Sequence, residues 1–303
     1  MENKEIIHQI ANTLCINVQN VTKYGLLQGR FGIAVFFYHY ARYTGDKRYN
    51  NFPDELISYL LKKIGKDYPK NLDDGLIGIG WGLDYVVKEG FVEADDNFFN
   101  EGDAEICKMD MSDFFKEMEL PIPLFSKGLY ALQRKKTDML KKSISEVNLF
   151  IEKLSSSKIP LLYLNSIIYV LLAYINMGEK TDEYKIILDN LYTNALRASH
   201  KKISYLNFLL LQKNISMMQD NYAKKWTELL SDSLIENSEP NSLYDKQFVN
   251  FLFDRGMNFP VDINEIYSLM RDLQNQQLNY NNLSIYKGLA GIGLAIMRNY
   301  PTL

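Results

Sequence analysis

The segment Gly29-Arg-Phe-Gly32-Ile-Ala is the first of three similar glycine motifs in this chain of 303 residues. The other two are Gly75-Leu-Ile-Gly78-Ile-Gly and Gly288-Leu-Ala-Gly291-Ile-Gly, and each motif opens an apolar run. Five steps of about 43 residues would cover the interval from the second motif to the third, and such a period is typical of an array of helical hairpins. Open solenoids usually end in atypical repeats. Because the first and last motifs are alike, we expect a closed ring, with residues 288–298 beside residues 29–37.

Two kinds of helical segment alternate along the chain. Amphipathic segments, such as residues 140–154 and 184–195, carry apolar side chains at helical spacing on one face. Between them lie segments that are apolar on nearly all sides, such as residues 31–43 and 161–174, and a helix of this kind is usually buried. The alternation predicts an all-α fold of about seven helical hairpins, with an inner and an outer ring of helices. The inner helices are expected to begin near Gly29, Gly75, Leu124, Leu161, Ser204, Tyr244 and Gly288.

Composition and charge limit the protein class. No linker rich in proline, glycine or serine divides the chain, so we predict a single domain over residues 1–303. The formal net charge of −3 argues against a dedicated nucleic-acid partner. The longest apolar stretch, residues 161–175, is shorter than the roughly 20 residues that span a bilayer, and the first ten residues are too polar for a signal peptide. With only two isolated cysteines, the sequence predicts a cytoplasmic protein without a transmembrane segment.

The glycine motifs resemble those of a known family. Gly25-Leu-Leu-Gln-Gly29-Arg-Phe-Gly32 resembles the GxxxGxxG repeat of lanthionine synthetase C-like (LanC-like) proteins, and the motifs at Gly75 and Gly288 look like further copies. The spacing extends this resemblance over essentially the whole chain. It implies an α/α toroid as the fold. The founding members of the family cyclise peptides by adding cysteine thiols to dehydroamino acids, at a zinc ion held by two cysteines and a histidine.

The positions that match the family's zinc ligands carry other residues in this chain. Tyr205 and Tyr244 stand where the resemblance would place the two cysteines, and Asp245 stands where it would place the histidine. Tyrosine and aspartate side chains do not form the thiolate-rich site that this zinc chemistry needs. The chain's own cysteines, Cys15 and Cys107, lie elsewhere. We therefore expect no metal, no other cofactor and no lanthionine cyclase activity.

The beginnings of the inner helices would line one mouth of a toroid. The candidate ligand-binding residues there are Asp74, Trp81, Tyr205, Tyr244 and Asp245. Aromatic side chains offer a large contact area at a small entropy cost, and carboxylates at the rim would select basic residues in a ligand. These features predict a site that binds an extended peptide without cyclising it.

Two functions stay open at this point. The first is a metal-free LanC-like protein that binds a peptide substrate or a partner protein as a scaffold in lanthipeptide-type or other ribosomal peptide maturation. The second is an enzyme, either a glycoside hydrolase-like toroid that uses Asp74 and Asp245 as its carboxylate pair, or a LanC-like peptide-modifying enzyme with other chemistry. No strong catalytic constellation is present, which favours the first.

One further segment, residues 93–119, is strongly acidic. It contains ten acidic and two basic side chains together with several phenylalanines. This acidic connector is interpreted either as a solvated loop with a short outer helix or as a docking surface for a basic partner.

Overall fold

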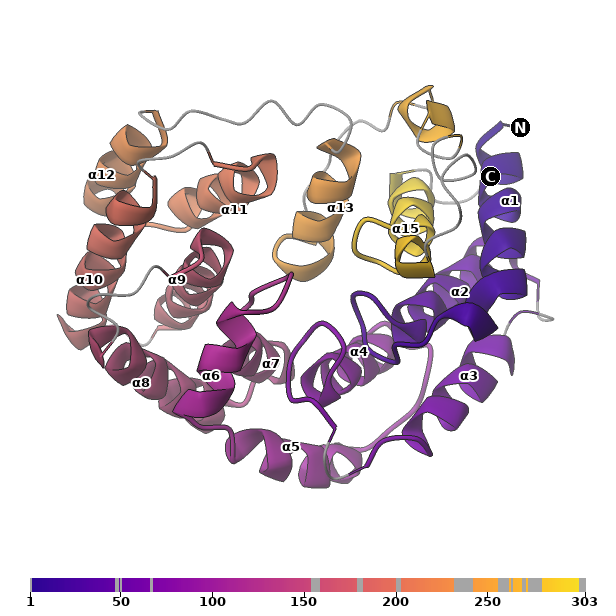
Figure 1. Cartoon of the computed structure of the whole chain (residues 1–303), viewed down its shortest axis with the longest axis horizontal. Helices are drawn as coiled ribbons and strands as arrows, with labels where there is room; N and C mark the ends of the chain where they lie inside the picture. Colours follow the sequence, from indigo (N-terminus) through magenta and orange to yellow (C-terminus); the bar gives the residue numbers. More distant parts are fainter. Residues whose placement is uncertain are drawn as a thin grey trace. The chain divides into compact units, whose positions relative to one another are not determined.

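Helices connected by loops make up the part of the chain that the structure describes. A computed structural model describes residues 2–46, 49, 51–65, 68–153, 159–178, 182–199, 203–231, 242–255, 262, 264–268, 271 and 280–299. All regular elements in these ranges are helices (Figure 1), which confirms the predicted all-α class. Within the same ranges no helix combines the length and the apolar character that crossing a membrane requires.

The helices group into two compact units. Unit 1 consists of Met1–Phe99 with Glu239–Leu303, and unit 2 consists of Asn100–Ser238. The α-helices of unit 1 are α1 (Glu2–Asn17), α2 (Arg30–Thr44), α3 (Asn51–Leu61), α4 (Leu76–Lys88), α13 (Ser242–Leu252) and α15 (Leu289–Asn299). Those of unit 2 are α5 (Asn100–Cys107), α6 (Met111–Met118), α7 (Ser126–Arg134), α8 (Thr137–Lys153), α9 (Leu161–Asn176), α10 (Asp182–Ser199), α11 (Tyr205–Ser216) and α12 (Asp220–Ser231). The single domain expected from composition stays a prediction.

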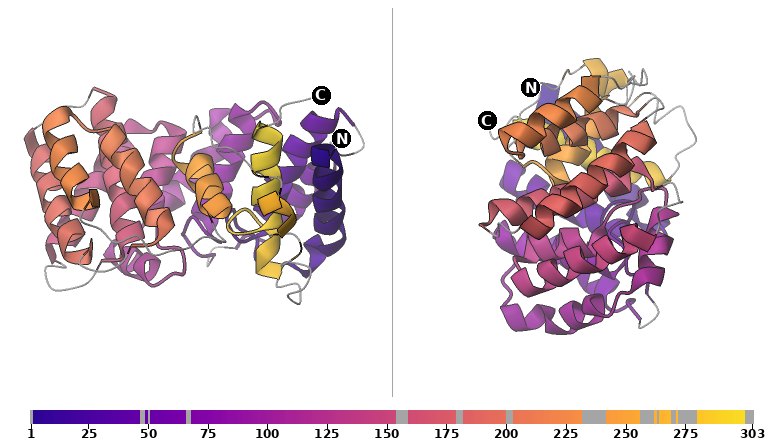
Figure 2. Two further views of the ribbon diagram at one scale, coloured as in Figure 1. Left: turned by 90° about the horizontal axis from the view of Figure 1, so that it is seen from above. Right: turned by 90° about the vertical axis from the view of Figure 1, so that its left-hand side faces the viewer.

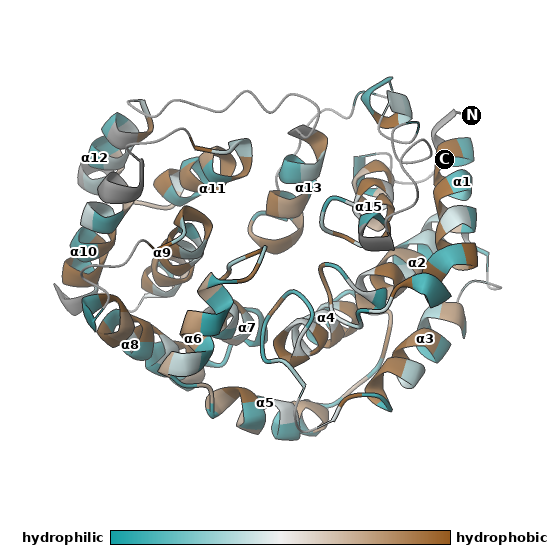
Figure 3. Ribbon diagram, viewed as in Figure 1, coloured by the Kyte–Doolittle hydropathy of each residue, from teal (hydrophilic) through white to brown (hydrophobic). Residues whose placement is uncertain are grey.

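Seven helices correspond to the predicted inner helices, and we call them the core helices: α2, α4, α7, α9, α11, α13 and α15. Each begins within about two residues of its predicted start. Most side chains of α9 and α15 are buried, whereas five of the twelve residues of α11 are buried. The helices between the core helices are amphipathic, which appears in Figure 3 as mixed colouring on α8 and α12. Buried and amphipathic helices therefore alternate in part of the described chain, for example α8, α9 and α15.

The glycine motifs build the same tight entry into each helix. The loop before α4 folds back over the helix start, so that a Cβ atom on Gly78 would lie 2.2 Å from the carbonyl oxygen of Leu72. At α15 a Cβ atom on Gly291 would lie 2.2 Å from the carbonyl oxygen of Ile285. Loop carbonyls also accept hydrogen bonds from first-turn amides, as in Gly78 N to Asn71 O. These amides are thereby satisfied without a side-chain cap.

The last core helix packs against the first hairpin. Helix α15 contacts α1, α2 and α13 in unit 1 (Figure 1). The Ser284 hydroxyl, in the loop before α15, donates to the carbonyl of Leu27 at 2.7 Å, and the Tyr286 amide donates to the same carbonyl at 2.8 Å. The predicted proximity of residues 288–298 to the first hairpin is confirmed.

In unit 2, hydrogen bonds from polar side chains connect neighbouring helices. In unit 1, glycines allow close backbone contact at the corresponding helix entries. Helix α9 packs against α7, α8, α10 and α11 (Figures 1 and 2). The side-chain Nδ2 of buried Asn165 donates to Asn207 Oδ1 at 3.2 Å, and the side-chain Nδ2 of buried Asn214 donates to the backbone carbonyl of Asn165 at 3.0 Å. Ser166 Oγ accepts from the amide of Phe125 at 2.8 Å. Hydrogen bonds thus replace close backbone contact in these repeats.

Candidate functional site

Four core helices of unit 1 direct their C-terminal ends toward one cavity. Its volume is about 400 Å³. The lining residues come from the ends of α2, α4, α13 and α15 and from the residues that follow them: His39, Arg42, Tyr43, Tyr85, Glu89, Phe251, Arg255, Leu294, Met297 and Arg298. We call this cavity the arginine pocket. Among the described residues, three guanidinium groups and a single carboxylate line it, so positively charged side chains are in excess.

The helix ends explain in part why arginines gather in this pocket. Arg42 and Arg298 lie in the last turns of α2 and α15, where a cation interacts favourably with the helix dipole and with free carbonyl groups. Arg42 is already engaged. Its Nη1 lies 3.6 Å from the Glu89 carboxylate, its Nη2 donates to the Glu89 carbonyl, and its guanidinium lies 3.7 Å from the centroid of the Phe91 ring.

One donor group of Arg298 has no partner in the part of the chain that the structure describes. Among the described residues, its buried Nη1 finds no hydrogen-bond acceptor. Arg298 also hydrogen-bonds to the Tyr85 hydroxyl, and that hydroxyl lies 2.7 Å from Nε2 of His39. Because a guanidinium group can only donate, the Tyr85 oxygen is the acceptor of the hydrogen bond from Arg298. An unsatisfied buried donor costs free energy, so Nη1 is a natural position for a ligand acceptor.

Two groups of the pocket, His39 and Tyr85, keep their protonation states near neutral pH. Burial, and then the positive charges of Arg298 and Arg42, lower the pKa of His39 to about 3. Burial, and then the negative charge of Glu89, raise the pKa of Tyr85 to about 12. A general acid or base works best when its pKa is close to the working pH. The arrangement therefore suits binding better than proton transfer.

Aromatic rings form the second wall of the pocket. Tyr85 and Trp81 are stacked, with centroids 5.7 Å apart and an interplanar angle of 8°, and both contact the Phe251 ring. The guanidinium of Arg255 lies 4.8 Å from the Tyr85 centroid and 5.4 Å from the Trp81 centroid. Cation–π contacts of this kind are attractive and favour this position of the Arg255 side chain. Arg255 and Arg298 thus both contact Tyr85, Arg255 at the ring and Arg298 at the hydroxyl.

Trp81 is the predicted site residue nearest to this pocket. Its side chain is only 2 % exposed and stands behind Tyr85 in the wall. The contact area that an exposed tryptophan would offer a ligand is not available at the surface. Trp81 supports the pocket instead.

Three other predicted residues lie at the opposite, N-terminal ends of the unit 1 core helices. Asp74 Oδ1 accepts hydrogen bonds from the amides of Tyr24 at 2.9 Å and Gly25 at 2.8 Å, which ties the entry of α4 to the entry of α2. Tyr244 and Asp245 lie in the first turn of α13 and are 7 % and 5 % exposed. The structure therefore gives Asp74 a clear architectural role and buries the other two.

The fifth predicted residue belongs to unit 2. Tyr205 is the first residue of α11, and its ring stacks on Phe208 with centroids 6.1 Å apart. In unit 1 the structure thus places Asp74 at the entry of α4, Tyr244 and Asp245 at the entry of α13, and Trp81 beside the arginine pocket. Tyr205 is described in unit 2.

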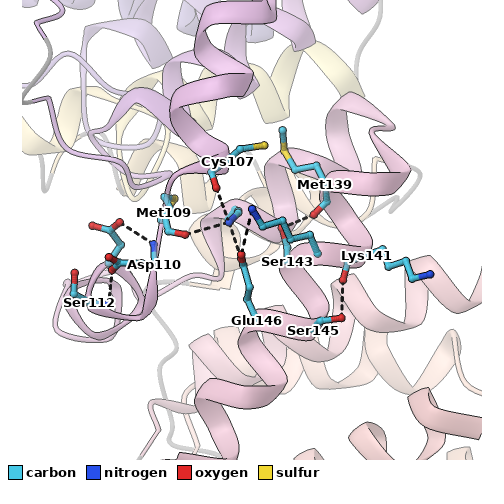
Figure 4. Close-up of polar contacts among 12 residues, drawn as sticks. Cys107, Met109, Asp110, Ser112, Met139, Lys141, Ser143, Ser145 and Glu146 are labelled. Carbon is cyan, nitrogen blue, oxygen red and sulfur yellow. Dashed lines mark hydrogen bonds and ion pairs between the residues drawn. The ribbon is translucent and has the colours of Figure 1, made fainter.

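The acidic connector is more ordered than a solvated loop. Its second part forms α5 and α6, and the fully buried Lys127 of α7 fastens the turn between them. Lys127 Nζ lies 2.6 Å from Glu146 Oε2 and donates to the carbonyls of Met109 at 3.2 Å and Cys107 at 3.4 Å (Figure 4). The carboxylate of Asp103 accepts from the Tyr130 hydroxyl at 2.6 Å. Backbone carbonyls of the connector and the Asp103 carboxylate are therefore used within unit 2.

The structure and the comparisons add two findings on identity. In the described part of the chain, no group of three or more histidine, cysteine, aspartate or glutamate side chains is arranged to hold a metal ion. The sequence matches no family model and no curated protein.

Sequence reasoning missed the arginine pocket because it concentrated on helix beginnings. The available signal was an arginine in the last turn of two apolar helices, next to aromatic residues. That signal is weak, since basic residues are common at helix C-termini for electrostatic reasons alone.

Proposed function

We propose that this chain is a LanC-like α/α-toroid protein that binds a peptide in ribosomal peptide maturation, as a recognition or scaffold component without cyclase activity. Three observations support the LanC-like part of the proposal. The glycine entries have the same geometry in different repeats, the last core helix packs on the first hairpin, and buried and amphipathic helices alternate in part of the described chain. Tyr205, Tyr244 and Asp245 at the positions of the family's zinc ligands support the absence of thioether chemistry.

The arginine pocket is the observation that carries the binding function. Ligand pockets typically measure about 300–1,000 Å³ and combine apolar walls with a few polar groups, and this pocket has both properties. His39 and Tyr85 keep their protonation states near neutral pH, as expected of groups that orient a ligand. The hydrolase alternative gains no such support, because Asp74 is held by two backbone amides at a helix junction.

Binding is tested with the full chain and a positional-scanning library of fluorescein-labelled dodecapeptides, by fluorescence anisotropy. We expect some sublibraries to bind, and the Arg255→Gln variant to bind them at least tenfold more weakly. Arg255 is exposed, so this change leaves the core intact. Arg271→Gln, at an exposed arginine of the same unit outside the pocket lining, is the matched control.

The outcomes separate the alternatives. A library without any binding sublibrary would contradict the peptide-binding function. Equal binding by the Arg255→Gln variant would move the site away from the pocket. Turnover of an oligosaccharide by the wild type, lost in Asp74→Asn or Asp245→Asn, would establish the hydrolase.

A further inference from the structure

We propose that the arginine pocket captures the C-terminal residue of a peptide, with the α-carboxylate at Arg298 and Arg255 and the side chain against the apolar wall. This inference rests on the proposed peptide-binding function and names the part of the peptide that the pocket recognises.

The first step of the argument concerns charge. Of the three guanidinium groups, that of Arg42 already pairs with Glu89, the carboxylate of the lining. Arg298 presents a buried Nη1 that has no acceptor among the described residues. With its pKa lowered to about 3, the neighbouring His39 carries no positive charge near neutral pH, so the arginines are the cationic groups that an anion would meet. A carboxylate oxygen would satisfy the open donor through a charge-assisted hydrogen bond, which is stronger than a neutral one.

The second step concerns the apolar wall. Tyr85, Phe251, Leu294 and Met297 line the same cavity as the arginines. An inorganic anion would leave this wall without a contact. The C-terminal residue of a peptide carries its carboxylate and its side chain on a single Cα atom, so it presents an anion and an apolar group side by side. This combination fits adjacent cationic and apolar walls.

The third step concerns size. A cavity of about 400 Å³ lies at the lower end of the range for small-molecule pockets. It takes the end of a peptide more readily than an extended segment, whose chain would have to enter and leave. Capture of the C-terminal carboxylate is a recurring mode of peptide recognition.

The inference is tested with an array of hexapeptides that are fixed by the N-terminus and randomised at the last two positions. Each sequence is present as the free acid and as the C-terminal amide, and a third set carries an internal glutamate with an amidated terminus. We expect free acids that end in an apolar or aromatic residue to bind the full chain, and their amides to bind at least tenfold more weakly. Binding is then quantified in solution by fluorescence anisotropy.

Two variants connect the preference to the pocket. Arg298→Gln and Arg255→Gln should each remove most of the difference between acid and amide, whereas Arg271→Gln should keep it. Because Arg298 is partly buried, its variant is accepted only if its helical circular dichroism and melting temperature match those of the wild type, and exposed Arg255 supplies the independent readout.

The results separate failure of this inference from failure of the proposed peptide-binding function. Equal binding of acids and amides would overturn this inference and leave peptide binding in place. Preference for the internal glutamate set would overturn it in favour of an acidic side chain. Absence of binding by every set would contradict the proposed function as well.

Discussion

Glu117 makes the stability of unit 2 depend on pH. Its side chain is 2 % exposed, accepts a hydrogen bond from the Tyr163 hydroxyl at 3.2 Å, and also bonds to Ser126 at the start of α7. The N-cap of α7, Phe125, has no side-chain acceptor, so Glu117 supplies a cap from α6. Burial raises the pKa of Glu117 from 4.5 to about 8, although hydrogen bonds from Ser126 and Tyr163 oppose this rise.

The direction of the pH effect follows from proton binding. Between about pH 4.5 and pH 8 the folded state keeps a proton on Glu117 that the unfolded state has released. The contribution of Glu117 to the free energy of unfolding therefore falls as the pH rises through this window, and this contribution changes little on either side of it. Because one pKa unit corresponds to about 1.4 kcal/mol, the loss is on the order of a few kcal/mol, a large part of a typical domain stability.

Glu117→Gln removes the ionisation and keeps the shape of the side chain. We expect the variant to be more stable than the wild type at pH 8.5 and of similar stability at pH 5. Urea unfolding followed by circular dichroism at several pH values measures both curves. Burial also raises the pKa of Asp73 in unit 1, to about 6, but Asp73 is present in both proteins, so the difference between them isolates Glu117.

The matched control is Glu119→Gln, at an exposed glutamate just after the same helix. It should show the wild-type dependence on pH. If the Glu117→Gln and wild-type curves run parallel from pH 5 to pH 8.5, then burial of this carboxyl group does not control stability and the reasoning is wrong.

Three further predictions concern packing and metal. Gly25→Ala should destabilise the chain by at least about 1–3 kcal/mol, because the added Cβ atom would lie 2.2 Å from the Cα atom of Asp74. Gly102→Ala is the control: its added Cβ atom meets open space, so the melting temperature should change little. Trp81→Ala should lower stability by about 3–5 kcal/mol in chemical denaturation because it empties a buried wall; a melt like that of the wild type would show that the ring is not needed for packing. Elemental analysis of the purified protein should find no stoichiometric zinc, and about one zinc per chain would refute the proposed loss of the family's metal site.

The sequence by itself predicted the positions of the core helices. The periodicity of apolar residues is a local property, because the side chains of one helical face are spaced by the turn of that helix alone. The start of α9 at Leu161 and of α15 at Leu289 could therefore be predicted without knowing any neighbour. The glycine motifs also predicted a contact between distant segments. Because the first and last copies are alike, the sequence correctly predicted that α15 lies beside α2.

The tertiary structure alone decided which side chains share a site and how each is used. The arginine pocket joins Arg42 near one end of the chain with Arg298 near the other, and neither residue stands out from an ordinary helix C-terminus in the sequence. Asp74 is a candidate catalytic acid in the sequence and becomes an acceptor for two backbone amides in the fold. Burial, hydrogen bonding and pKa depend on groups that are distant in sequence and close in space, and a local pattern contains no information about those distances.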